Sequence, residues 1–191
     1  DWSWSRGLGD VYKRQQLWRF ISNYNFPLKS KKDIQHHYDV GGEKGEKLYD
    51  IFLDKKHRQY SCAYFKTPND TLEQAQQNKL DHIIKKLNIK SGQKLLDIGC
   101  GWGGLAFEIA RQKQCEVLGI SLSENQIKYC KEKAKEHNLD NQVRFELIDY
   151  RHVKGKFDRI VSVGMAEHLG KKFYKTYFKQ INELLKNDGI G

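Results

Sequence analysis

The chain has 191 residues, of which 38% are hydrophobic and 12% aromatic, and this is enough apolar material for one domain core but not for two. Lys and Arg outnumber Asp and Glu by 34 to 24, and the resulting net charge of +10 is typical of proteins that bind nucleic acid or an anionic membrane. The four cysteines lack any C-x-x-C pair or ligand spacing with the seven histidines, so the sequence supports neither a disulfide framework nor a metal site. No segment has the pattern of a signal peptide or a membrane span.

The N-terminal part divides into two segments. The string DVYKRQ at Asp10–Gln15 is typical of a translated sequencing-library adapter, so residues 1–15 are set aside as non-native. Residues 16–59 are predicted to form an N-terminal linker or lid. Its expected features are a short helix within Leu17–Phe26, a glycine loop at Gly41, Gly42 and Gly45, and a short helix over Lys47–Leu53.

Residues 60–191 are predicted to form one α/β domain. A first helix opens at Thr71 with Glu73 in its first turn, and its expected buried face comprises Leu72, Ala75, Leu80, Ile83, Ile84 and Leu87. Strands and helices then alternate. The expected strands are Leu95–Ile98, Glu116–Leu122, Gln142–Ile148 and Phe157–Val163, and helices begin near Leu105, Ser123 and Phe173. Right-handed crossovers make this a doubly wound, mainly parallel sheet with its ligand at the carboxyl ends of the strands.

The C-terminal residues predict a sheet that is incomplete. Asn187–Gly189 reads as the stop signal of the last helix, and Asp188–Ile190 reads as the start of a fifth strand. We therefore expect the chain to be a fragment that is inactive by itself, and we expect its fourth strand to be an unpaired edge.

A glycine turn is the strongest local signal. In LLDIGCGWGG, at Leu95–Gly104, a buried strand containing Asp97 leads through glycines into a helix, so a ligand can approach the main chain and the free helix N–H groups. The glycine spacing also fits a dinucleotide fingerprint. That fingerprint needs an acidic residue at the end of the second strand, where this chain has SLS at Ser121–Ser123.

Five motifs together resemble one family. They are YSCAYF at Tyr60–Phe65, LLDIGCGWGG, SLSENQ at Ser121–Gln126, DYR at Asp149–Arg151 and FDRIVSVGMAEHLG at Phe157–Gly170. In this order they resemble the cyclopropane-fatty-acyl-phospholipid synthases and mycolic acid cyclopropane synthases, which are Rossmann-like class I methyltransferases that use S-adenosylmethionine.

The resemblance implies a set of cofactor-binding residues. Tyr60 and Ser61 would bind the methionine end of the cofactor. The glycine turn would bind the same end through Asp97, Gly99, Gly101 and Gly103. Ser121 and Gln126 would bind the ribose, and Asp149 with Tyr150 would flank the adenine. Taken singly, Ser121, Ser123 and Asp149 also fit capping and loop roles.

The resemblance also implies the reaction. A methyl group would pass to a cis double bond of an unsaturated phospholipid acyl chain, and proton loss would close a cyclopropane ring. Aromatic faces would stabilise the carbocation, with Tyr60, Tyr64, Phe65 and Trp102 as candidates. A bicarbonate ion would take the proton.

The candidate catalytic residues are Cys62, Glu167 and His168, of which Cys62 and Glu167 would contact the bicarbonate. Alternatively, Cys62 is a small core residue, and the Glu-His pair starts the next helix and meets water. Ala166 replaces a bulkier residue, often Phe, that is usual in the family, and this would widen the acyl pocket.

The expected partner is an anionic membrane surface carrying the unsaturated phospholipid. A cytoplasmic protein peripheral to the inner face of the membrane is expected, with a possible homodimer at full length and no nucleic acid. Two other classes of protein remain open. One is an amine N-methyltransferase, because some of these enzymes share the YS-x-x-YF motif. The other is a nucleic-acid-binding module, which is supported only by the net charge.

Overall fold

The computed structural model describes residues 45–191. The expectations for residues 1–15, for Leu17–Phe26 and for Gly41 and Gly42 lie outside the described residues. The described part opens with α3 (Gly45–Phe52), which confirms the short helix expected there. The expectation that Gly45 lies in a loop is wrong, because the helix begins two residues earlier than expected and includes it.

Five parallel strands form one sheet with the order β3-β2-β1-β4-β5. The strands are β1 (Lys94–Ile98), β2 (Glu116–Ser121), β3 (Val143–Leu147), β4 (Phe157–Val161) and β5 (Leu185–Ile190). The doubly wound parallel sheet is thereby confirmed. β2, β3 and β4 end one or two residues before the expected positions, which leaves residues such as Leu122 and Ser162 in the loops at the carboxyl edge.

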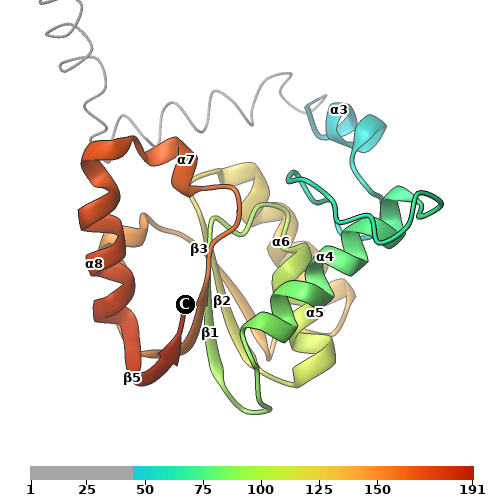
Figure 1. Ribbon diagram of the computed structural model, residues 1–191. Helices are drawn as coiled ribbons and strands as arrows, with labels where there is room; N and C mark the ends of the chain where they lie inside the picture. Colours follow the sequence, from blue (N-terminus) through green and yellow to red (C-terminus); the bar gives the residue numbers. More distant parts are fainter. Residues whose placement is uncertain (1–44) are drawn as a thin grey trace, which may run out of the picture.

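Helices cover both faces of the sheet (Figure 1). On one side lie α4 (Leu72–Lys86), α5 (Gly104–Lys113) and α6 (Glu124–Glu136), and on the other lies α8 (Tyr174–Leu184). The short elements η2 (Tyr150–His152), α7 (Ala166–Leu169) and η3 (Lys171–Phe173) belong to the loops around the sheet.

The core is split between these two faces. Leu95 packs into the apolar cluster beneath α4 and α5, whereas Leu96 packs into the cluster beneath α8. This alternation along β1 is what a strand buried on both faces produces. Asp97 is the next residue after Leu96 and so returns to the face of Leu95.

The expected start of α4 at Thr71 is confirmed as a capping box. The Thr71 hydroxyl accepts from the Gln74 backbone N–H at 3.2 Å, and the Gln74 side chain accepts from the Thr71 N–H at 2.8 Å. The expectation that Leu72 is buried is wrong: it is 38% exposed, because the first turn of α4 projects beyond the core. Two polar residues, Gln76 and Lys79, are buried on this helix instead.

The expectation of an unpaired fourth strand is wrong. β5 begins at Leu185, directly after α8 and three residues before the expected start, so it is long enough to pair with β4. Phe157 pairs with Leu185 and Arg159 with Ile190, with a register shift between them. Asn187–Gly189 therefore lies within the strand and is not the helix stop.

None of the helices described between residues 45 and 191 has the length and apolar character needed to cross a membrane.

Candidate functional site

The glycine turn lies at the carboxyl edge of β1, in the middle of the sheet. Gly99, Gly101 and Gly103 all have left-handed backbone angles, with φ of 80°, 54° and 82°, which explains the need for glycine. A Cβ at Gly101 would meet no atom within 4 Å, whereas one at Gly99 would lie 3.4 Å from the Met165 sulfur. The turn is therefore open to a ligand at Gly101 and partly covered at Gly99.

Gly103 and Gly104 serve packing instead. A Cβ at Gly103 would lie 2.9 to 3.0 Å from the side chains of Phe107, Cys130 and Phe145, so this glycine faces the core. At Gly104 a Cβ would overlap the backbone carbonyl of His57. Gly103 belongs to the predicted motif, but the space beside it is already filled by protein.

Asp97 is an ionisable residue whose carboxyl group can still accept a hydrogen bond. It is 3% exposed, and its Oδ2 has no hydrogen-bond partner in the described part of the chain. Burial raises the pKa of this carboxyl to about 7. Since buried acceptors are normally paired, Asp97 fits a ligand that brings a donor or a cation to the end of β1.

The YSCAYF segment reaches the same edge. A Cβ at Gly164, just beyond β4, would lie 3.8 Å from Glu167 Oε1 and 3.9 Å from Ser61 Cβ. The structure thus brings Ser61 and Glu167, 106 positions apart in sequence, to one place. Cys62 beside Ser61 is exposed, as are Glu167 and His168 on α7.

The predicted ribose residues lie together beyond β2. The Ser121 hydroxyl donates to Gln126 Oε1 at 2.8 Å and accepts from the Ser123 N–H at 3.1 Å. Ser123 caps α6 through the Gln126 N–H at 3.3 Å. The alternative capping and loop roles are therefore realised for both serines, and also for Asp149, which accepts from the Arg151 N–H at 2.9 Å. The Ser121 hydroxyl still retains one lone pair for a ligand.

The predicted adenine residues lie at the start of η2. Asp149 accepts from Arg151 Nε at 2.8 Å and from Nη2 at 2.6 Å. Burial opposes the charge on Asp149, but the bonds and charge of Arg151 outweigh it and lower the pKa of the carboxyl. The Tyr150 ring packs edge-on against Tyr177 in the core, with centroids 5.2 Å apart, so only its backbone and edge remain for a ligand.

A cation clamps the described end of the N-terminal segment onto the glycine turn. The Arg58 guanidinium lies 4.3 Å from the Trp102 ring centroid and 4.6 Å from that of Tyr129, and it pairs with Asp50 at 3.0 Å. Trp102 is only 3% exposed. It supports the clamp and is too buried to present its face to a reacting alkene.

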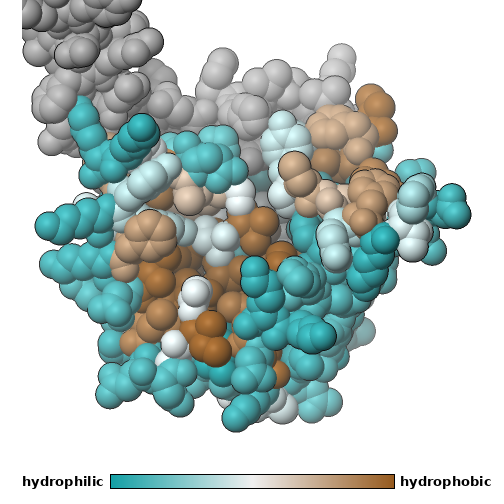
Figure 2. Space-filling view, viewed as in Figure 1, coloured by the Kyte–Doolittle hydropathy of each residue, from teal (hydrophilic) through white to brown (hydrophobic). Residues whose placement is uncertain are grey.

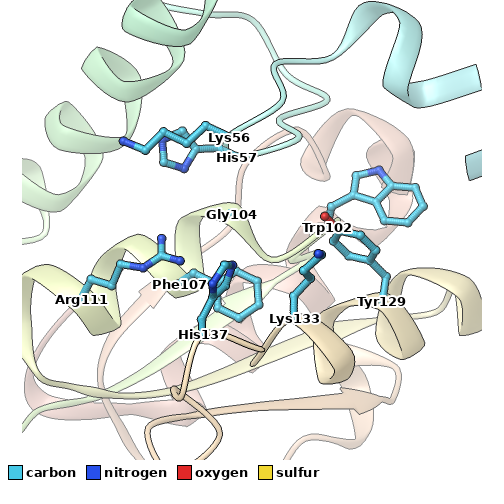
Figure 3. A pocket seen from close by; sticks show the side chains of 9 residues that line it. All are labelled: Lys56, His57, Trp102, Gly104, Phe107, Arg111, Tyr129, Lys133 and His137. Carbon is cyan, nitrogen blue, oxygen red and sulfur yellow. The ribbon is translucent and has the colours of Figure 1, made fainter. Parts of the chain in front are cut away.

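A cavity of about 20 Å³ lies behind this clamp (Figure 3). Basic side chains face it from three parts of the chain: Lys56 and His57 before α4, Arg111 of α5, and Lys133 of α6 with His137 directly after that helix. Its volume holds about one water molecule, far less than a nucleoside needs. This cavity is therefore too small for the cofactor, whereas the turn at Gly101 has open space beside it.

Sequence reasoning missed three residues at the open edge. Lys79 and Gln76 both bond to Ser61 from α4. Tyr177 of α8 is buried, feels the charges of Asp97 and Glu167, and has its pKa raised mainly by burial. A signal existed for the first two, because positions 76 and 79 fall on the apolar stripe of α4, where polar residues are unusual.

Comparison with known proteins identifies a family and relatives that this chain resembles. Residues 26–190 match the family model described as mycolic acid cyclopropane synthetase. The cyclopropane-fatty-acyl-phospholipid synthase of Escherichia coli K12 is 46% identical over 169 residues, 86% of this chain and 42% of that protein. A probable fatty acid methyltransferase of Pseudomonas putida is 42% identical over 159 residues, 82% of this chain and 39% of that protein.

Two solved structures of cyclopropane synthases are similar to this chain. The cyclopropane synthase MmaA2 of Mycobacterium tuberculosis superimposes with a TM-score of 0.77 at 34% identity, and CmaA1 in complex with SAH and CTAB superimposes with 0.78 at 33%. Each match covers 84% of this chain and 55% of the other. The fold is that of a class I methyltransferase, and the chain spans about two fifths of the curated relatives cited above. A family match over more than four fifths of its residues shows that this chain belongs to the mycolic acid cyclopropane synthetase family.

Proposed function

We propose that this chain is the cofactor-binding part of an S-adenosylmethionine-dependent methyltransferase that converts the cis double bond of an unsaturated phospholipid acyl chain into a cyclopropane. The observation that carries this proposal is the 46% identity to a cyclopropane-fatty-acyl-phospholipid synthase. The structural match to CmaA1, whose complex contains SAH, supports the cofactor.

The residues at the edge of the sheet fit S-adenosylmethionine. Asp97 is a buried carboxyl with an unused oxygen, which suits the amino group of the methionine part. Gly101 leaves open space beside the main chain, and Ser121 with Gln126 offers polar atoms at the next strand end. When bound, the sulfonium supplies the methyl group.

Residues of this chain would then support the chemistry around the alkene. Tyr60, Tyr64 and Phe65 are each about half exposed beside the site, and their faces can stabilise the substrate carbocation. Cys62 and Glu167, with His168 beside them, are the proposed binding shell of a bicarbonate that removes the proton. Trp102 is dropped from the aromatic set because of its burial.

Exposed apolar side chains support a lipid substrate. Figure 2 shows them gathered over α3 and the segment that follows it, where Ile51, Phe52, Tyr60, Tyr64 and Phe65 are 46% to 79% exposed. A net charge of +10 adds attraction to an anionic bilayer. We infer a cytoplasmic protein that binds the inner face of the membrane peripherally, with a homodimer as a further expectation at full length.

The test is lipid mass spectrometry after expression of the complete gene in a host that lacks its own cyclopropane lipids. Unsaturated acyl chains should gain one CH₂. A Gly101→Val variant, which fills the open space of the turn, should abolish the gain. Methylated amines without any cyclopropane lipid would overturn the proposal in favour of an amine N-methyltransferase.

A further inference from the structure

Two buried polar side chains of α4 hold Ser61. The Lys79 ammonium donates to the Ser61 hydroxyl at 2.7 Å, and the Gln76 amide donates to the Ser61 carbonyl at 3.0 Å. Lys79 is 8% exposed and Gln76 is 3% exposed. A buried lysine is costly to keep charged, so its place beside a candidate ligand residue calls for a reason.

The charge of Lys79 is not neutralised by a direct ion pair in residues 45–191. The charged or titratable groups that face it are Asp54 and Cys62. Both oxygens of Asp54 already accept backbone N–H groups, from His57 at 2.6 Å and from Gln59 at 2.8 Å. Part of the positive charge is therefore left to act on Ser61 and on whatever binds there.

The direction of the Lys79–Ser61 hydrogen bond follows from the chemistry of an ammonium. An ammonium has three hydrogens and no lone pair, so the Ser61 oxygen must accept. The hydroxyl hydrogen of Ser61 is then free to be donated elsewhere, and the adjacent cation makes that hydrogen a stronger donor. Such a hydroxyl suits a carboxylate.

We propose that Lys79 is a positioning residue that keeps the Ser61 hydroxyl turned as a hydrogen-bond donor toward the carboxylate of the cofactor's methionine end. This inference rests on the proposed function, because it takes S-adenosylmethionine as the ligand. It adds a residue on α4 to the site and gives the site a dependence on pH.

Deprotonation would reverse the bond. Burial lowers the pKa of Lys79 to about 8, although the charges of Asp54 and Cys62 oppose the shift. A neutral amine can accept the Ser61 hydrogen, which turns the oxygen lone pairs toward the ligand. The contribution of Lys79 to the affinity for a carboxylate-bearing ligand should therefore be present below about pH 8 and be lost above it.

The experiment is isothermal titration calorimetry of the complete protein with S-adenosylmethionine and with its decarboxylated form, from about pH 6.5 to about pH 9.5. The variants are Lys79→Met and Lys79→Arg. At pH 7 we expect Lys79→Met to weaken S-adenosylmethionine binding roughly tenfold or more, with the decarboxylated form nearly unaffected. Lys79→Arg should bind as the wild type does at pH 7 and should decline less above about pH 8, since guanidinium stays charged and only the ligand's α-amino group then titrates.

Variants are compared at equal pH, because the α-amino group of the ligand titrates identically for all of them. If Lys79→Met does not fold, the pH profile of Lys79→Arg decides alone. Equal ligand preference and equal pH profiles in all three proteins would overturn the role of Lys79 and leave the proposed function standing. Failure of the wild type to bind S-adenosylmethionine at any pH would instead overturn the proposed function.

Discussion

Single residues of this site differ in how far the sequence could specify them. The position of Asp97 before the glycines could be predicted, because a strand-turn-helix pattern fixes where its backbone lies. The lack of a partner for its Oδ2 could not be predicted, because hydrogen-bond partners come from distant segments of the chain. The same holds for Lys79, whose neighbours Asp54 and Ser61 precede α4 in the chain.

At Asp97, burial has a predictable effect on stability. The folded-state pKa of about 7 lies above the ordinary 3.8, so the folded protein holds this proton more tightly than the unfolded chain does. Without ligand, this residue should make the free energy of unfolding fall from about pH 4 to about pH 7 and level off above. In Asp97→Asn this part of the pH dependence should vanish, and affinity for S-adenosylmethionine should drop roughly tenfold.

Thermal melts across that pH range and calorimetry measure both effects. The exposed Asp140→Asn is the matched control, and it should alter neither the pH profile nor the affinity. An Asp97→Asn protein with the wild-type pH profile would show that the carboxyl is not held neutral by burial.

The family resemblance grouped some side chains that meet in the structure and failed for others. Ser121 and Gln126 meet because a strand end and the first turn of the next helix are linked by a short local geometry. The ring orientations of Tyr150 and Trp102 were harder to predict. Whether an aromatic ring faces a ligand or the core depends on packing partners such as Tyr177 and Arg58. No local pattern carries that information.

At the scale of elements, the helices and strands were largely predictable from periodicity. β1 contains all of its expected residues and begins one residue earlier, at Lys94, and α4 starts where the capping signal at Thr71 placed it. β5 was misjudged because Asn187, Asp188 and Gly189 are typical turn residues, and tertiary pairing with β4 overrides that local preference.

The capping box of α4 matters for function because α4 carries Gln76 and Lys79. Thr71→Ala removes an acceptor for the Gln74 N–H and should cost about 1 kcal/mol of the free energy of unfolding. Urea denaturation measures this loss. Thr176→Ala, on the exposed side of α8, should change stability by less than about 0.5 kcal/mol, and equal losses in both variants would contradict the capping role.

For the whole molecule, charge and exposed apolar surface predict how it meets a membrane. We expect the protein to cosediment with vesicles containing phosphatidylglycerol, and the bound fraction to fall as salt rises from about 50 mM to about 500 mM. Phosphatidylcholine vesicles should bind it weakly. The double variant Ile51→Ser and Phe65→Ser should bind less at every salt concentration, because both side chains are exposed at the apolar patch over α3.

Salt-independent binding, or a double variant that binds like the wild type, would contradict this mode of membrane contact. Net charge was visible in the composition, but the place of the apolar patch was not. It depends on how α3 and the YSCAYF segment sit above the sheet.

The contact between Gly104 and the His57 carbonyl has a practical consequence for engineering. A side chain at Gly104 would displace the main chain at His57, so the root of this segment and the start of α5 cannot be altered independently. Tyr64 and Phe65 lie half exposed beyond that root, so changes to their side chains do not displace it. Mutant libraries that test the proposed carbocation-stabilising role of these two rings are best confined to them, with residues 54–58 left as they are.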